Sequence, residues 1–288
     1  MRSFRIGTLI CCMLLVPCAG STAQTRDHSV PYNVKLVPEI VRFEALGPPP
    51  GELATRLAVE KGKQPATRKS TTLIGRLSRP VAMGALPAIV LLHGSGGVSP
   101  WNDLWIDRLT GWDYVVLDVD SRASRGLHRH SRRQVAPILR AYDALGALMY
   151  LRRQDFVVAD RIAVIGASHG GTTATLAIAP MRGVASKDQF RAAVAVSPLC
   201  RRLESLVAPL LVVIGRADDM TPAERCETKL LETPSRYELS LKVYPDAHHG
   251  FDSPGADSKP WGLTLRYNEQ AAKRATAEIK AFLAKYLR

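Results

Sequence analysis

The fold is decided by the stretch Ile162-Ala163-Val164-Ile165-Gly166-Ala167-Ser168-His169-Gly170-Gly171. Its first four residues form an apolar run that suits a buried strand, and a stretch rich in small residues that suits a helix follows. Between them lies the pattern G-x-S-x-G, whose glycines allow a very tight turn. Such a turn lifts the serine hydroxyl above the sheet and places the helix N-terminus behind it. The stretch therefore predicts a strand–turn–helix elbow with Ser168 as a nucleophile.

Short aliphatic runs recur on both sides of this elbow. Most lack polar alternation, as expected of parallel strands buried on both faces. The expected strands are 73–77, 88–92, 114–117, 162–165, 192–196, 210–214 and 239–244, and the expected helices are 135–153, 170–179 and 267–287. Alternating strands and helices predict an α/β fold with a mostly parallel central sheet and helices on both faces. Residues 197–209 are too few for a large cap domain.

A serine hydroxyl is a weak nucleophile and needs a base that is itself held by an acid. After a nucleophile elbow of this kind, the acid and then the histidine follow later strands of the sheet. Asp218 and Asp219 come after the next-to-last expected strand, and Asp218 fits the position of the acid better. His248 and His249 come after the last strand, and we favour His249 as the base.

Acyl transfer also needs donors for the oxyanion that develops on the carbonyl oxygen. The run His93-Gly94-Ser95-Gly96-Gly97 follows the strand 88–92 and matches the glycine-rich loop that supplies a backbone N–H. We expect the N–H groups of Ser95 and His169 to be the two donors. The His169 side chain cannot easily fold back onto the preceding serine, so we interpret it as structural or substrate-lining.

Several arginines follow the expected strand 114–117, at the edge of the sheet where binding sites form. One hypothesis is that Arg125 receives an anionic group of the substrate, and the alternative is an ordinary solvated basic face. His128-Arg129-His130 resembles a metal-binding pair. However, no further ligand follows at a useful spacing and the arginines oppose a cation. We therefore expect no metal and no cofactor.

The chain of 288 residues has a formal net charge of +13. Such a charge favours anionic surfaces or substrates. We predict no nucleic-acid binding, because the sequence contains no helix-turn-helix, zinc finger or aromatic–basic platform.

The N-terminus has the features of a signal peptide. Arg2 and Arg5 precede the apolar run 6–16, and Ser21-x-Ala23 fits a cleavage site, which predicts an exported, periplasmic or secreted protein that starts at Gln24. The apolar run is too short for a membrane span, which needs about 20 residues. Cleavage would leave two of the five cysteines, Cys200 and Cys226, which form a disulfide candidate in an oxidising compartment.

From Leu73 to the C-terminus the sequence resembles the dienelactone hydrolase-like branch of the α/β-hydrolases. The matching pieces are Leu73–Leu77 with Pro80, Val90–Gly97, Leu117-Asp118 through Asp120-Ser121 with Arg125-Gly126, Arg140 with Asp143-Ala144, Asp160-Arg161-Ile162, the elbow, Gly215 with Asp218 and Pro222, and Tyr244–Asp252. In that branch the histidine lies two residues before a Phe and the acid lies three residues after a Gly, which selects His249 and Asp218.

The sequence departs from dienelactone hydrolases themselves in two respects. Their nucleophile is a cysteine, where this chain has Ser168, and they carry a glutamate near the oxyanion loop, which is absent from 91–97. The resemblance therefore implies an α/β-hydrolase fold and a serine esterase or lactonase for small esters rather than for dienelactone. An acyltransferase and a hydrolase-fold binding protein without activity are the alternatives. The predicted organisation is a signal peptide at 1–23, an N-terminal extension at 24–72 and a catalytic domain at 73–288.

Overall fold

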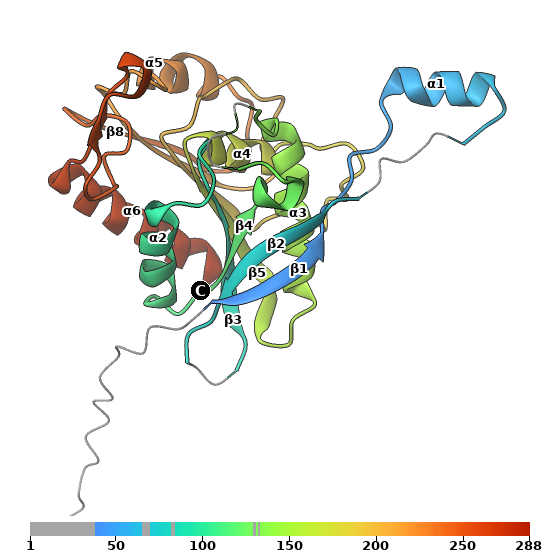
Figure 1. The fold of residues 1–288 in the computed structure, drawn as a ribbon, viewed down its shortest axis with the longest axis horizontal. Coiled ribbons are helices and arrows are strands. Elements are labelled where there is room, and N and C mark those ends of the chain that lie inside the picture. Colours follow the sequence, from blue (N-terminus) through green and yellow to red (C-terminus); the bar gives the residue numbers. More distant parts are fainter. Residues whose placement is uncertain (1–37, 65–69, 82–83, 129–130, 132) are drawn as a thin grey trace, which may run out of the picture. The chain divides into compact units, whose positions relative to one another are not determined.

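An eight-stranded sheet forms the centre of the protein in the computed structural model, which describes residues 38–288 except 65–69, 82–83, 129–130 and 132 (Figure 1). The strands are β1 Glu39–Glu44, β2 Thr72–Ser78, β3 Leu86–Leu92, β4 Val115–Asp120, β5 Val157–Ala167, β6 Ala192–Val196, β7 Leu210–Gly215 and β8 Leu239–Tyr244. Their order is β1-β2-β4-β3-β5-β6-β7-β8. The strand β2 runs antiparallel to both of its neighbours, β1 and β4, and all other neighbouring strands are parallel. The predicted mostly parallel α/β sheet is confirmed.

Helices cover both faces of this sheet (Figure 1). The helices are α1 Glu52–Glu60, α2 Pro100–Thr110, α3 Pro137–Arg152, α4 His169–Ala177, α5 Ala223–Arg225 and α6 Glu269–Leu287, with a π-helical turn at Cys226–Leu230. Two short strands, β9 Asp257–Ser258 and β10 Leu265–Arg266, pair near the C-terminus, and 3₁₀ turns occur at Ala123–Arg125 and Pro260–Gly262. No helix or strand occurs in residues 197–209, as expected of a fold without a large cap there.

The core consists of two apolar layers, one on each face of the sheet. Val90 and Leu92 of β3 pack on the face covered by α3 and α4, whereas Ile89 and Leu91 pack on the face covered by α2 and α6. Alternate side chains of a strand point to opposite faces, so a fully apolar strand contributes to both layers. Each of these side chains is fully buried, which stabilises the fold by about 1.5–3 kcal/mol per residue.

The sheet begins before the predicted domain boundary at residue 73. The edge strand β1 pairs with β2, and Phe43 lies opposite Leu73. Val41 and Phe43 are buried, and the Phe43 ring lies 5.6 Å from the ring of Tyr150 on α3. The strand β1 therefore belongs to the main sheet, although the predicted domain starts at residue 73. The predicted signal peptide, 1–23, lies outside the described residues.

The helix α1 lies between β1 and β2 in the sequence and projects away from the sheet (Figure 1). No residue of α1 is buried, and Leu53 and Val59 are exposed. Among the described residues, no helix combines the length and the apolar character that a membrane crossing requires.

Candidate active site

Ser168 lies at the sharp turn between β5 and α4. Its backbone has φ +53° and ψ −118°, a strained conformation for a residue with a side chain. Close packing explains the two glycines beside it. A Cβ on Gly166 would lie 2.2 Å from the Gly170 carbonyl oxygen, and a Cβ on Gly170 would lie 2.3 Å from the Leu92 carbonyl oxygen. The G-x-S-x-G spacing therefore places Ser168 at the carboxyl end of β5, as the elbow prediction requires.

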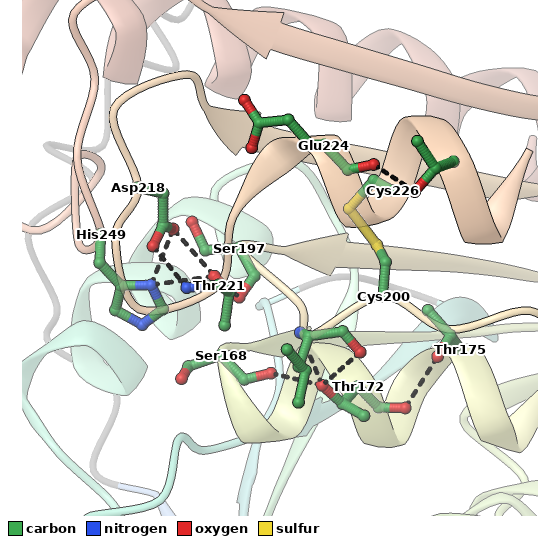
Figure 2. Close-up of a disulfide and its surroundings, with 12 residues drawn as sticks. Ser168, Thr172, Thr175, Ser197, Cys200, Asp218, Thr221, Glu224, Cys226 and His249 are labelled. Atoms are coloured by element: carbon green, nitrogen blue, oxygen red, sulfur yellow. Dashed lines mark hydrogen bonds and ion pairs between the residues drawn. A yellow bond between two sulfur atoms is a disulfide. The ribbon is translucent and has the colours of Figure 1, made fainter.

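Asp218 and His249 follow β7 and β8 and meet at the same edge of the sheet. His249 Nδ1 lies 2.8 Å from Asp218 Oδ2, and both residues are buried. The bond to the carboxylate places the Nδ1 proton toward Asp218, which leaves Nε2 as the acceptor. Figure 2 shows Ser168 on the side of the His249 ring that carries Nε2. The hydrogen bond thus joins the predicted base to the predicted acid, and Ser168 lies at the same edge of the sheet.

The acid is held in place by its own loop. Asp218 Oδ1 accepts hydrogen bonds from the backbone N–H groups of Met220, at 3.0 Å, and Thr221, at 2.8 Å. The Thr221 hydroxyl lies 2.9 Å from Asp218 Oδ2, 3.2 Å from His249 Nδ1 and 3.1 Å from the Ser197 carbonyl oxygen (Figure 2). Sequence reasoning missed Thr221, although an Asp whose side chain accepts from residues two and three positions later is typical of a turn. Asp219 turns away and accepts from the backbone N–H of Thr264.

The loop 93–97 lies against the nucleophile. A Cβ on Gly94 would lie 3.8 Å from both the Ser168 Cβ and the Ala167 carbonyl oxygen. His169 is the first residue of α4, and the amide groups of a first helical turn have no acceptor within the helix. The N–H of His169 and the loop that contains Ser95 therefore flank Ser168 from two sides.

Behind this loop lies a buried arginine that sequence reasoning noted only as part of the resemblance. Arg140 Nη2 donates to the His93 carbonyl oxygen at 2.7 Å, and Arg140 Nη1 lies 2.7 Å from His169 Nδ1. Burial, followed by the charges of Arg140 and Arg122, lowers the pKa of His169 to about 4. Burial and the Arg140 charge lower the pKa of His93 to about 3. Both imidazoles are therefore neutral at physiological pH, and His169, bound to Arg140, is not placed to act as the base.

Arg125 lies in a different environment from the one we hypothesised. Its guanidinium donates to both carboxylate oxygens of Asp143 at 2.8 Å and to the Ser121 carbonyl oxygen at 2.8 Å. The partner, Asp143, is buried on α3, so the pair fixes the segment after β4 to that helix. Because its donors are occupied in this way, we do not include Arg125 in the proposed substrate-binding residues.

Arg129 and His130 of the run His128-Arg129-His130 lie outside the described residues. Within the part of the chain that the structure describes, no group of three or more His, Cys, Asp or Glu side chains is arranged to hold a metal ion.

Cys200 and Cys226 form a disulfide beside the triad (Figure 2). Cys200 follows β6, and Cys226 begins the π-helical turn after the loop of Asp218. Next to the disulfide, Thr172 of α4 accepts a 2.9 Å hydrogen bond from the Leu199 backbone N–H. The segment after β6 is thereby attached to the helix of the nucleophile on one side and to the segment that follows the acid loop on the other.

Comparison with known proteins identifies the family. Residues 73–287 match the model of the dienelactone hydrolase family. A protein from Bradyrhizobium sp named "Probable 2-oxo-3-(5-oxofuran-2-ylidene)propanoate lactonase" is 27% identical over 219 residues, which are 66% of this chain and 86% of that protein.

Solved structures share the fold at lower identity. A dienelactone hydrolase-like promiscuous phosphotriesterase, P91, from metagenomic libraries is 17% identical with a TM-score of 0.59, and the match covers 88% of this chain and all of that one. Thermogutta terrifontis esterase 2, phosphorylated by paraoxon, is 20% identical with a TM-score of 0.53 and covers 74% of this chain and 88% of its own.

Proposed function

Because the chain belongs to the dienelactone hydrolase family and is therefore an ester-bond hydrolase, we propose that it cleaves small carboxylic esters or lactones with Ser168 as the nucleophile, His249 as the base and Asp218 as the acid. The observation that carries this proposal is the 2.8 Å contact between His249 and Asp218 beside a serine in a strained elbow. Strain of this kind costs about 1–3 kcal/mol, and it persists where the surrounding structure enforces a functional geometry.

The proposed reaction has two steps. First, His249 Nε2 takes the Ser168 proton while Oγ attacks the ester carbonyl carbon, and the resulting imidazolium returns this proton to the departing alkoxide, so that an alcohol leaves and an acyl-enzyme remains. Second, His249 takes a proton from water, the hydroxide attacks the acyl carbon, and Ser168 regains its proton as the carboxylic acid leaves. Asp218 stays ionised throughout, orients the ring and stabilises its charged form.

The oxyanion of each tetrahedral intermediate would be stabilised by the N–H groups of Ser95 and His169. The loop that contains Ser95 lies against Ser168 at Gly94, and the His169 amide lies at the positive end of the α4 dipole, which favours a negative charge. Loss of one donor in such a site typically costs 10²–10³-fold in kcat.

The first test is hydrolysis of p-nitrophenyl acetate and butyrate by the wild type beside Ser168→Ala, together with labelling by a fluorophosphonate and by paraoxon. We expect activity and a covalent phosphoryl adduct on Ser168 in the wild type, and neither in the variant. An active but unlabelled wild type, or an active Ser168→Ala, would reject the serine mechanism. Transfer of the acyl group to an added alcohol in preference to water would favour the acyltransferase alternative.

We further propose that the protein is exported and starts at Gln24. The charged and apolar N-terminal pattern supports this, and the Cys200–Cys226 disulfide suits an oxidising compartment. Cell fractionation with N-terminal sequencing tests the idea, and full-length protein retained in the cytoplasm would contradict it.

A further inference from the structure

We infer that Arg140 is a positioning residue that fixes the oxyanion site by joining the two backbone segments that carry its donors. The inference rests on the proposed function, because it assigns Arg140 a role in the same reaction. It adds a residue that touches neither the substrate nor the triad.

The geometry connects three elements through one side chain. Arg140 lies in the first turns of α3, and its guanidinium reaches the His93 carbonyl oxygen at the end of β3 and the His169 ring at the start of α4. His93 begins the loop that holds Ser95, and His169 provides the second proposed donor. Both hydrogen bonds are 2.7 Å long, within the normal range for charged donors. One rigid planar group therefore joins the residue that begins the Ser95 loop to the side chain of His169, whose N–H is the second proposed donor.

The setting of Arg140 is costly for a residue that serves stability alone. The side chain is 2% exposed, its two close acceptors are uncharged, and its Nε has no hydrogen-bond partner among the described residues. A cation near a helix N-terminus is also disfavoured by the helix dipole. Burial lowers the pKa of Arg140 to about 10, and only the charges of Asp143 and Asp120 favour the ionised form. A buried charge with such compensation is poor evidence for a stabilising role.

The contact also determines the state of His169. A guanidinium can only donate, so His169 Nδ1 accepts and the ring carries its proton on Nε2. The charged or titratable groups facing this ring are Arg140 from α3, Arg122 from the segment after β4, and His93. Two of them are cations, and both oppose protonation of the ring. The ring thus keeps one orientation and one charge, and the amide of the same residue keeps its direction.

The test compares Arg140→Gln and Arg140→Lys with Arg152→Gln. Arg152 is a matched control because it lies on the same helix and also donates to backbone carbonyls, those of Ala159 and Gln189, but at the far end of α3. The readouts are kcat and KM for p-nitrophenyl acetate, and inhibition by a trifluoromethyl ketone and by the methyl ketone of the same skeleton. The trifluoromethyl ketone forms a tetrahedral adduct with Ser168 whose oxyanion needs the two donors, whereas the methyl ketone reports ground-state binding.

We expect Arg140→Gln to lower kcat by about 10²-fold, the typical effect of losing one oxyanion donor, with KM changed less than about threefold. Affinity for the trifluoromethyl ketone should fall by a similar factor while methyl ketone affinity is unchanged. The kcat of Arg140→Lys should lie between those of the wild type and Arg140→Gln, because an ammonium can reach one of the two acceptors but cannot hold both in one plane. The control should match the wild type.

Unchanged kcat in Arg140→Gln, or equal losses for both ketones, would overturn the inference. If that variant does not fold, Arg140→Lys and a histidine NMR titration of the wild type decide instead. If His169 stays neutral with its proton on Nε2 at pH 5.5, the result supports the inference about Arg140. If His169 titrates near pH 6.5, the result overturns it. A wild type that hydrolyses no ester and takes no fluorophosphonate label would instead reject the proposed function, and is thereby distinguishable.

Discussion

Replacing Asp218 by Asn tests whether the acid loop orients the base. Asp218 Oδ1 accepts two backbone N–H groups, and Oδ2 faces His249 Nδ1. An asparagine that kept its oxygen toward the two N–H groups would turn its NH₂ toward Nδ1. The opposite orientation would leave those two donors unpaired, at about 1–3 kcal/mol each. The asparagine therefore adopts the first orientation, with its NH₂ toward His249. The imidazole must then accept at Nδ1 and carry its proton on Nε2.

In that tautomer the base cannot take the Ser168 proton. We expect kcat/KM for p-nitrophenyl acetate to fall about 10⁴-fold, the size seen when a triad acid is made neutral in a serine protease. This equals about 5.4 kcal/mol of transition-state stabilisation. Thermal unfolding should change little, because the shape and the backbone contacts of the loop are retained.

The matched control is Asp219→Asn, one residue away. Asp219 is exposed and accepts from the backbone N–H of Thr264, so activity should stay within about threefold of the wild type. The assignment of the acid would be refuted if Asp218→Asn kept more than a tenth of the activity, or if the large loss of activity occurred in Asp219→Asn instead.

Three further predictions concern the elbow, the disulfide and the loop histidine. Gly170→Ala brings a Cβ to 2.3 and 2.6 Å from two backbone carbonyl oxygens and should lower both kcat and the unfolding temperature, whereas Gly51→Ala, with open space around its Cβ, should change neither. The double change Cys200→Ser and Cys226→Ser should lower the free energy of unfolding in urea by about 3.5 kcal/mol, the entropic value for a loop of 26 residues; a loss below about 1 kcal/mol would count against the bridge in solution. The pKa of His93 lies near 3 in the folded protein and near 6.5 in the unfolded chain, so acidification below pH 6.5 favours unfolding. Relative to His93→Gln, the wild type should therefore lose about 1.4 kcal/mol per pH unit, and parallel pH curves would contradict this.

The elements that could be predicted from the sequence are those marked by a pattern within a few consecutive residues. Every strand from β2 to β8 contains an apolar run that is readable alone, and the glycines around Ser168 are required by backbone contacts within one turn. The strand β1 was missed because it is short and three of its six residues are charged, although the alternation of its buried side chains is a signal of an edge strand. The helix α2 was not predicted either, although Ser99 and Pro100 form a typical helix start.

The site was predictable to the extent that chain order determines it. Asp218 and His249 follow the strands after which an acid and a base are expected, and the structure brings them together. The roles of Thr221 and Arg140 depend on contacts between segments 28 to 47 residues apart, which no local pattern reports. The same holds for the contact between Arg125 and Asp143, which lie 18 residues apart on different elements.

The projecting connection that carries α1 has a practical consequence for engineering. It joins two antiparallel neighbours, β1 and β2, and its helix buries no residue. Antiparallel neighbours can be joined by a turn of a few residues, so most of this segment is dispensable for closing the sheet. We therefore expect this segment to be a suitable insertion site for an affinity tag, a fluorophore or a second enzyme. Ser168 and its partners lie on other strands, so an insertion here should leave them undisturbed.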